Sequence, residues 1–301
     1  MRILEETARE FLRDDCPRMA AALSYYTMFS LPGLLLLIML FAGLFADPEE
    51  IRSRILEPIR VLIGARGAAQ VREILESAER PGAGNPLVVL VGGAALLFAA
   101  TGAFAQLQGA LNRIWQVAPD PGRRGAVRSF LAKRVLSFFM ILGLALLLLA
   151  STVASTMLTA LGDTVRAVLP APLTGAALQA VSLGLTLLVA TVLFGLLFHI
   201  LPDARVAWRD AWSGAAATGA LFLLGNLLLG LYLGRSDPGS AFGAAGALAL
   251  ILVWLYYSAN IFFFGAELTQ VIARRRGEEI RPAPGAVRVV IEQHVIREDP
   301  Q

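Results

Sequence analysis

Residues 173–201 read LTGAALQAVSLGLTLLVATVLFGLLFHIL and contain no Asp, Glu, Lys or Arg. An α-helix rises 1.5 Å per residue, so about 20 apolar residues cross a hydrocarbon core of roughly 30 Å. This stretch is long enough to do so. His199, two residues from its end, is its one titratable side chain. The stretch therefore predicts a transmembrane helix with His199 at the membrane interface.

The composition of the whole chain points the same way. Of its 301 residues, 56% are hydrophobic and 16% are charged, whereas soluble domains contain about 25% charged residues. The chain has more apolar surface than a globular protein needs for its core. We therefore predict an integral membrane protein. The single cysteine, Cys16, excludes a scaffold built on disulfides. The net charge of +3 is too small to indicate a nucleic-acid-binding protein.

Five other stretches satisfy the same length criterion. They lie at about 20–46, 87–112, 135–161, 211–233 and 241–273. We therefore predict an all-α, polytopic membrane protein with a six-transmembrane-helix bundle over residues 20–273 and amphipathic interfacial helices. A cytoplasmic interfacial helix at 1–19 precedes the bundle, and a mobile cytoplasmic tail at 274–301 follows it.

Two segments outside the predicted spans have amphipathic helical patterns. Leu4, Ala8, Phe11 and Leu12 share one face of the N-terminal segment, which suits a helix lying in the membrane interface. The external segment 47–80 carries a similar pattern twice. We expect either a helix packed on the spans with a solvated outer face, an interfacial helix, or a lid over the bundle.

The distribution of Lys and Arg predicts the orientation. The N-terminus, the loop 113–134, the loop 202–210 and the C-terminal tail together hold 18 of these residues, and the loops on the other side hold 8. Basic residues concentrate in cytoplasmic loops. Both termini are therefore predicted to be cytoplasmic.

Polar residues within the spans mark the faces that point into the bundle, because polar groups in hydrocarbon cost free energy unless they face protein or water. The candidates for a substrate cavity are Tyr25, Tyr26, Gln108, Asn112, Asn226, Tyr256, Asn260 and Glu267. Each amide or hydroxyl taken singly is explained by bonding between helices, worth about 1 kcal/mol or less. Their convergence from four spans favours a polar cavity.

Glu267 is the one acidic residue of the sixth span, and it lies about two turns before Arg274. A carboxylate there meets the negative end of the helix dipole, so it should be protonated or paired with a cation. Arg113 and Arg134, at the cytoplasmic ends of the second and third spans, are the candidate partners. Two interpretations stay open: an ion pair that locks helix ends, or a gate linked to protons.

No catalytic motif, cofactor motif or metal-ligand array occurs in the sequence. We therefore expect no enzymatic activity, no cofactor and no bound metal. The loop after the second span is strongly basic, through Arg123, Arg124, Arg128 and Lys133. Anionic lipid headgroups account for such a loop more simply than nucleic acid does, at about 1 kcal/mol per base near the surface.

Three segments resemble the YihY/virulence factor BrkB family of bacterial inner-membrane proteins, once labelled ribonuclease BN. They are ALSYYTMFSLP at 22–32, LP at 201–202 with WRD at 208–210 and SGA at 213–215, and FGAAG at 242–246 with WLYY at 254–257 and GAEL at 265–268. The resemblance extends over about residues 10–275, although Phe242 stands where the family usually has Tyr. It implies six spans in the inner membrane with both termini inside.

The resemblance also implies a role in envelope lipid export or serum resistance. We therefore expect a transporter or lipid-translocase-like protein that moves an amphipathic or anionic substrate through an intramembrane polar cavity, with membrane lipids as its partners. The alternative is a structural or regulatory envelope protein that transports nothing and acts through partner binding. The ribonuclease label is not expected to hold, because metal-dependent RNA hydrolysis needs clustered His, Asp or Glu ligands.

Overall fold

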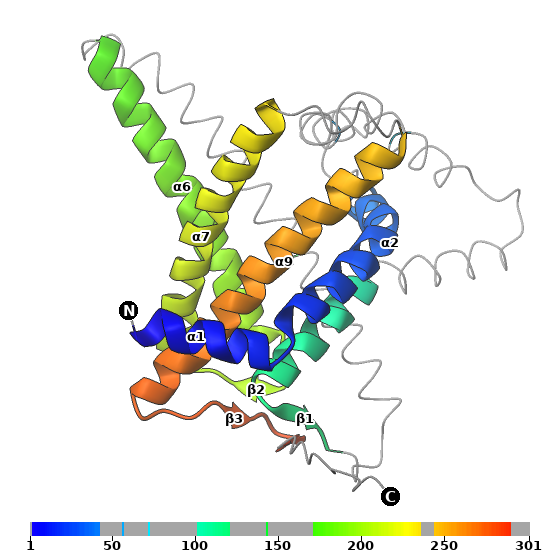
Figure 1. Ribbon diagram of the computed structural model, residues 1–301, viewed down its shortest axis with the longest axis vertical. Helices are drawn as coiled ribbons and strands as arrows, with labels where there is room; N and C mark the ends of the chain where they lie inside the picture. The colour runs from blue at the N-terminus through cyan, green and yellow to red at the C-terminus, as the bar shows by residue number, and fades with distance from the viewer. Residues whose placement is uncertain are drawn as a thin grey trace, which may run out of the picture.

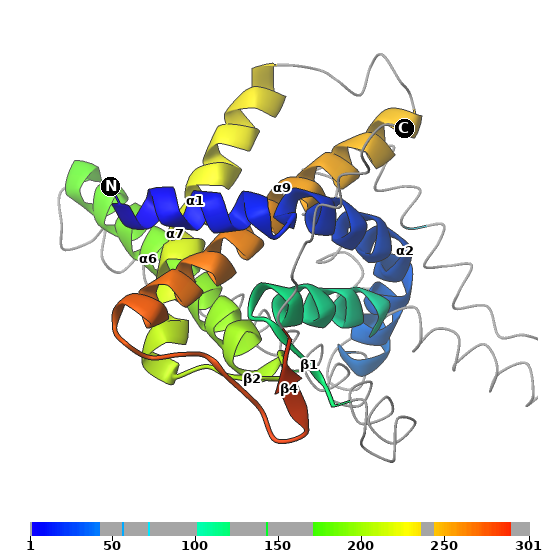
Figure 2. The ribbon, with the colours of Figure 1, turned by 60° about the horizontal axis from the view of Figure 1, so that its bottom comes forward.

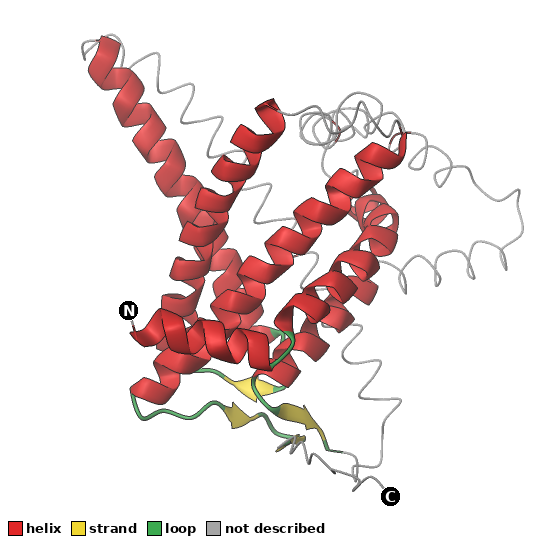
Figure 3. Cartoon of the chain, viewed as in Figure 1, coloured by secondary structure: helices red, strands yellow, loops and turns green. Residues whose placement is uncertain are grey.

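The computed structural model describes residues 2–42, 101–120, 171–235 and 244–289, with the single residues 56, 72 and 143. Most of these residues are helical, and four short strands lie at one end of the helices (Figure 3). The helices are α1 (Arg2–Arg13), α2 (Cys16–Ala42), a helix whose described part is 101–114, α6 (Ala171–Ile200), α7 (Trp208–Arg235) and α9 (Ala244–Arg275).

Three of the described helices are long and apolar enough to cross a membrane. The qualifying parts are Gln179–Ile200, Trp208–Leu228 and Ile251–Arg275, and they confirm long apolar helices at the fourth, fifth and sixth predicted spans. Helix α2 and the helix 101–114 coincide with the first predicted span and the end of the second. The third span, 135–161, and nearly all of the external segment 47–80 lie outside the described residues, so the count of six stays a prediction.

Helix α9 is the centre of the described bundle. It packs against both α2 and α7, and α6 packs on α7 (Figure 1). Phe198 of α6 and Phe262 of α9 meet in the core with ring centroids 5.0 Å apart, and Trp115 packs edge-on against Phe198. The aromatic core therefore joins three segments that are far apart in the sequence.

A close crossing joins α7 to α9. Thr218 of α7 lies against Gly265 of α9, and Thr269 of α9 lies against Gly214 of α7. Each threonine hydroxyl donates to the carbonyl of the glycine four residues before it in its own helix, at 2.7 Å for Thr218 and 2.8 Å for Thr269. Small residues four apart permit such close packing. Each helix carries one Gly-x-x-x-Thr motif, and the threonine of each motif packs on the glycine of the other.

Helix α1 lies across the end of α9 (Figure 2). Leu4, Ala8 and Leu12 are exposed on its outer side, whereas Phe11 packs against Phe264 of α9 with ring centroids 5.9 Å apart. The apolar face predicted for this helix is therefore divided between the surface and α9. A turn at Asp14–Asp15 separates α1 from α2, and Asp15 has φ 59°, a left-handed conformation that aspartate tolerates better than most residues.

The segment after α9 is held by strand pairing. Strand β1 (Val117–Pro119) pairs antiparallel with β4 (Ala286–Arg288), and β2 (Ala204–Arg205) pairs antiparallel with β3 (Arg281–Pro282). Gly277, with φ 77°, ends α9, and the amide of Glu278 donates to the carbonyl of Ala273, as in a Schellman cap. Backbone bonds to two loops therefore hold residues 281–288 beside the helices, and residues 290–301 of the predicted mobile tail lie outside the described residues.

The four described segments that were predicted to be cytoplasmic all lie at one end of the helices. They are α1, residues 113–120, residues 201–207 and the C-terminal segment 276–289 (Figure 1). The strands and the contacts of α1 with α9 tie them together. The structure thus agrees with the sidedness of the predicted loops, and the compartment itself stays a prediction.

Candidate functional site

Glu267 is fully buried, at 0% exposure, where α9 meets the start of α2. The Cys16 thiol donates to Glu267 Oε1 at 3.5 Å. The Gln270 amide, oriented with its nitrogen toward this group, donates to Glu267 Oε2 at 3.2 Å and to the Ile114 carbonyl at 3.1 Å. The side chain of Asp14 lies within hydrogen-bonding reach of Glu267, so that a proton on either carboxyl group can be donated to the other. Two carboxyl groups are therefore in contact, in what we call the carboxyl pair, Asp14 and Glu267.

The turn between α1 and α2 positions the carboxyl pair. It places Asp14 and Cys16 beside α9, and it directs Asp15 toward Arg113, whose guanidinium lies 3.8 Å from Asp15 Oδ2. The predicted ion pair of Glu267 with Arg113 is therefore replaced by one between Arg113 and Asp15. The reason is that the turn brings its own acids next to both groups. The other candidate partner, Arg134, lies outside the described residues.

The surroundings of Asp14 disfavour its ionised form. Burial raises the pKa of Asp14 above 3.8, and the negative charge of Glu10 raises it further, while Arg13, Arg113 and the hydrogen bond with Glu267 act in the opposite sense without reversing the shift. A carboxyl group that resists ionisation and touches a second carboxyl can share one proton with it. The pair can therefore hold a proton at the point where α1, α2 and α9 meet.

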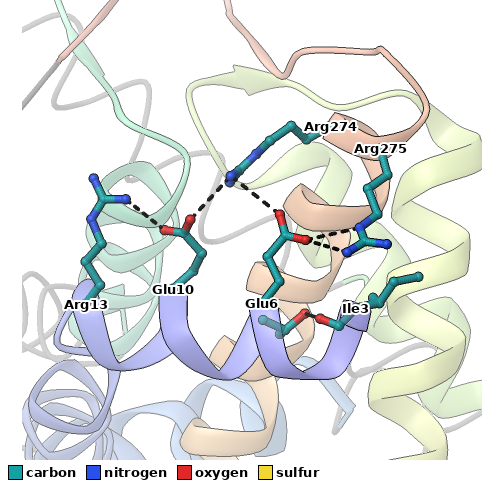
Figure 4. A network of polar contacts seen from close by, with 7 residues as sticks. Ile3, Glu6, Glu10, Arg13, Arg274 and Arg275 are labelled. Atoms are coloured by element: carbon teal, nitrogen blue, oxygen red, sulfur yellow. Dashed lines mark hydrogen bonds and ion pairs between the residues drawn. The ribbon is translucent and has the colours of Figure 1, made fainter. Parts of the chain in front are cut away.

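Ion pairs fasten α1 over the end of α9 (Figure 4). Glu6 meets Arg275 at 2.7 Å and Arg274 at 3.8 Å, and Glu10 meets Arg274 at 3.3 Å. Arg13 approaches the other oxygen of Glu10 at 3.3 Å. All these groups are partly exposed, so each pair contributes roughly 0–1 kcal/mol. Together they fix the turn that carries Asp14.

A second polar cluster lies around Asp203, in the loop between α6 and α7. Asn112 donates from Nδ2 to Asp203 Oδ2 at 2.7 Å and accepts at Oδ1 from the Asp203 amide at 2.8 Å. Gln108 Nε2 lies 3.4 Å from Asp203 Oδ1. The Asp203 carbonyl accepts from the amide of Ala283 at 2.9 Å. Asp203 therefore joins the helix 101–114, the α6–α7 loop and the C-terminal segment.

A third polar contact at this end of the bundle joins the start of α7 to the segment after α9. Asp210, buried in the first turn of α7, forms an ion pair with Arg276 just beyond α9. The carboxylate is buried while the guanidinium is a third exposed. Removing the cation would leave a buried charge unpaired, which is costly.

The structure separates the predicted cavity residues into several groups. Gln108 and Asn112 converge on Asp203, and Glu267 lies in the carboxyl pair. Tyr25 and Tyr26 are 58% and 49% exposed on α2. The last three candidates are Asn226, Tyr256 and Asn260. Asn226 is exposed on α7, and Asn260 donates to the carbonyl of Tyr256 in its own helix at 2.7 Å.

The site residues predicted from the sequence do not include Asp14, Cys16, Asp203 or Gln270. Two signals in the sequence could have found Asp14 and Gln270: the acidic pair Asp14–Asp15 directly before the first span, and the position of Gln270 three residues after Glu267, on the same face of α9. The basic residues Arg123, Arg124, Arg128 and Lys133 lie outside the described residues. Within the described ranges no group of three or more His, Cys, Asp or Glu could hold a metal ion.

His199 lies one residue before the end of α6, and its position at the membrane interface stays a prediction. Its ring stacks on Trp208 with centroids 3.8 Å apart, and its Nδ1 lies 2.8 Å from the Val206 carbonyl. The ring therefore connects the end of α6 to the start of α7.

Comparison with known proteins gives the family of the chain. The model of the family described as virulence factor BrkB matches residues 7–289. A UPF0761 membrane protein of Alkalilimnicola ehrlichii is 31% identical over 88% of this chain, and one of Pseudomonas aeruginosa PAO1 is 30% identical over 95%. A third, of Azotobacter vinelandii, is 29% identical over 91%. No solved structure matches the chain.

These relatives are longer than the chain. It spans 57% of the Alkalilimnicola protein, 64% of the Azotobacter protein and 68% of the Pseudomonas protein. The family model nevertheless covers nearly all of the chain, including the segment that carries Asp14, the Asp203 loop and the strands after α9. The chain therefore belongs to the virulence factor BrkB family of membrane proteins.

Proposed function

We propose that this protein is a transporter or lipid-translocase-like protein that moves an amphipathic or anionic substrate across the inner membrane, and that it couples this movement to protonation of the carboxyl pair. The observation that carries the proposal is the contact of Asp14 with the fully buried Glu267, at the predicted cytoplasmic end of the membrane-spanning helices. Transmembrane helices rarely contain a buried acid without a functional reason.

The carboxyl pair has a simple chemistry. With one proton, a carboxylic acid donates to a carboxylate, while the thiol of Cys16 donates to Oε1 of Glu267 and the amide of Gln270 donates to its Oε2. Without that proton, two negative charges face each other. At a separation of about 4 Å and an effective dielectric constant of about 20, such a pair repels by roughly 4 kcal/mol.

Proton binding therefore affects how the helices pack. Asp14 belongs to the turn between α1 and α2, whereas Glu267 belongs to α9. Loss of the shared proton pushes the turn away from α9, and gain of the proton draws them together. A proton-dependent contact between two helices at one end of a bundle is a suitable gate, because it opens that end without breaking either helix.

The charges at this end favour an anionic substrate. The segments on the predicted cytoplasmic side hold 18 of the 26 Lys and Arg residues. A lipid headgroup or a small amphipathic anion would be concentrated there by its own charge. The proposal includes no enzymatic step, and purified protein is expected to leave RNA intact.

Flux measurements in vesicles test the proposal. The full chain is reconstituted with fluorescent lipids of several headgroups, and the movement of label between leaflets is followed at acidic and alkaline pH. We expect movement above protein-free vesicles and a clear dependence on pH. Glu267→Gln, which keeps hydrogen bonding but cannot ionise, is expected to remove the pH dependence.

Glu279→Gln is the matched control, because Glu279 is an exposed acid of the C-terminal segment, paired with Arg288 at 2.8 Å. It should keep both the flux and its pH dependence. Absence of movement above protein-free vesicles for every headgroup at every pH would count against a translocase. An unchanged pH profile in Glu267→Gln would count against the carboxyl pair.

A structural or regulatory protein that acts through partner binding is the second candidate. The observation that favours it is the number of ties at one end of the bundle, where the Asn112–Asp203 contact, the Asp210–Arg276 pair and the two strand pairs fasten separate segments together. Such a platform suits docking. Crosslinking in cells distinguishes the candidates, since this one predicts a defined protein partner attached through the C-terminal segment and no flux.

A further inference from the structure

The start of α7 carries exposed aromatic and basic side chains at the level where two spans end. Trp208 and Trp212 are 46% and 38% exposed, and Arg205 and Arg209 are exposed beside them. We call these four residues the α7 patch. Large exposed indoles next to arginines need an explanation, because Trp is normally at least partly buried.

Contacts from α6 hold the two indoles in place. Trp208 stacks on the ring of His199 with an interplanar angle of 24°, and Trp212 stacks on Trp208 with centroids 6.1 Å apart. The Trp212 ring also lies against Gly195, where an added Cβ would stand 3.4 Å from two of its ring atoms. The rings are therefore presented to the surroundings in a fixed orientation.

The α7 patch lies where the apolar parts of two helices end. The apolar part of α6 ends at Ile200 and that of α7 begins at Trp208. Further along α7 most of the exposed side chains are apolar, at Ala216, Ala220, Leu224, Leu227 and Leu228, and Asn226 is the polar exception. This outer surface thus passes from arginine and tryptophan to aliphatic residues, in the order in which a lipid passes from headgroup to acyl chain.

The neighbouring acids are directed away from the α7 patch. Asp210 is buried against Arg276, and Asp203 is engaged by Asn112. Within the part of the chain that the structure describes, Arg205 and Arg209 form no ion pair. The patch therefore presents two positive charges to whatever lies outside it.

We propose that the α7 patch binds the headgroup of an anionic phospholipid. Arg205 and Arg209 contact the phosphate, since arginine matches phosphate geometry with paired N–H donors. Trp208 and Trp212 lie at the level of the glycerol and carbonyl groups, where amphipathic rings are favoured. This site is independent of the proposed transport activity, because it requires no substrate movement, and its test needs none.

The test measures lipid affinity of the purified full chain in neutral detergent. Phosphatidylglycerol and phosphatidylcholine are titrated separately, and binding is followed by the shift in unfolding temperature and by quenching of tryptophan fluorescence with brominated lipid. We expect saturable, salt-sensitive binding of phosphatidylglycerol in preference to phosphatidylcholine. The double variant Arg205→Gln/Arg209→Gln should weaken it at least about fivefold, the amount expected for loss of one base near a lipid surface.

The double variant Arg281→Gln/Arg288→Gln is the matched control, because it removes the same charge from exposed positions of strands β3 and β4. It should keep the wild-type affinity. Trp208→Leu should reduce the quenching by brominated phosphatidylglycerol, which gives a readout that does not depend on the arginine variants. Equal affinity for the two lipids, or equal losses in the patch and control variants, would overturn the proposal.

Discussion

Gly214 of α7 lies directly against Thr269 of α9, so that a Cβ added to Gly214 would stand 2.9 Å from the Thr269 Cβ. Thr269 has no room to withdraw. Its side chain is fully buried, and its hydroxyl is bonded to the Gly265 carbonyl. The same relationship recurs in reverse, where Thr218 of α7 lies against Gly265 of α9. This double contact fixes the position of α9, and with it the position of Glu267.

Gly214→Ala is therefore expected to destabilise the protein by about 1–3 kcal/mol, the cost of overpacking a well-packed contact. Thermal unfolding in detergent measures the effect. Gly109→Ala is the control, since Gly109 is an exposed glycine of the helix 101–114 with nothing within 4 Å of an added Cβ. It should be neutral or stabilising by up to about 1 kcal/mol. Equal stability of the two variants would contradict the crossing described here.

Asn112→Ala removes both hydrogen bonds to Asp203. The Asp203 carboxylate, which is partly buried, and the Asp203 backbone amide then both lack the Asn112 side chain as a partner. This loss costs about 1–3 kcal/mol. Gln108→Ala should cost less, because its contact with Asp203 is a single one at 3.4 Å. Denaturation of the two variants, measured side by side, checks the order. A larger loss in Gln108→Ala than in Asn112→Ala would show that Asn112 is not the main link.

Stability should depend on pH through Asp14. Because the pKa of Asp14 is raised in the folded protein, the folded state binds a proton more tightly than the unfolded state. The stability that this proton contributes is fully present below about pH 3.8, the ordinary value for aspartate, and is lost as pH rises through the higher folded value.

Asp14→Asn tests this dependence. Relative to the wild type, the variant should gain stability as pH rises above 3.8, because an amide cannot acquire the buried charge. The unfolding temperatures of both proteins are compared over a pH series, and Glu5→Gln, at an exposed acid of α1, provides the baseline. A constant difference between Asp14→Asn and the wild type at every pH would contradict the shifted pKa.

Both ends of the described chain should lie in one compartment. Cys16 is the single cysteine and is buried, so cysteines introduced at Leu12 and Gly285 can be labelled against a silent background. A membrane-impermeant maleimide is expected to react with both only when it reaches the cytoplasmic face, as the excess of Lys and Arg predicts. Labelling of the two positions from opposite faces would exclude the proposed topology.

Much of the fold follows from local patterns. The apolar stretches at 173–201, 211–233 and 241–273 were predicted as helices and are confirmed as α6, α7 and α9. Such predictions succeed because the cost of placing a side chain in hydrocarbon is a property of each residue and adds along the helix.

The partners of the polar residues could not be predicted in the same way. Cys16 and Glu267 are 251 residues apart, and their contact depends on the angle at which α2 meets α9. The expectation of an Arg113–Glu267 pair failed because charge and depth in the membrane do not show which acids a neighbouring turn will supply. Strand pairing of the C-terminal segment likewise depends on two loops that become neighbours only after the helices have packed.

One physical cause explains why the helices could be predicted from the sequence and the contacts between polar residues could not. Insertion into lipid is decided residue by residue, so the amino-acid order was sufficient to locate α6, α7 and α9 and to group the described basic segments at one end of the helices. Recognition between buried polar groups requires matched positions and orientations across helices, and these arise only from packing. The contact of Asp14 with Glu267 is therefore a property of the assembled bundle, where Gly214, Thr218, Gly265 and Thr269 bring α7 and α9 into register.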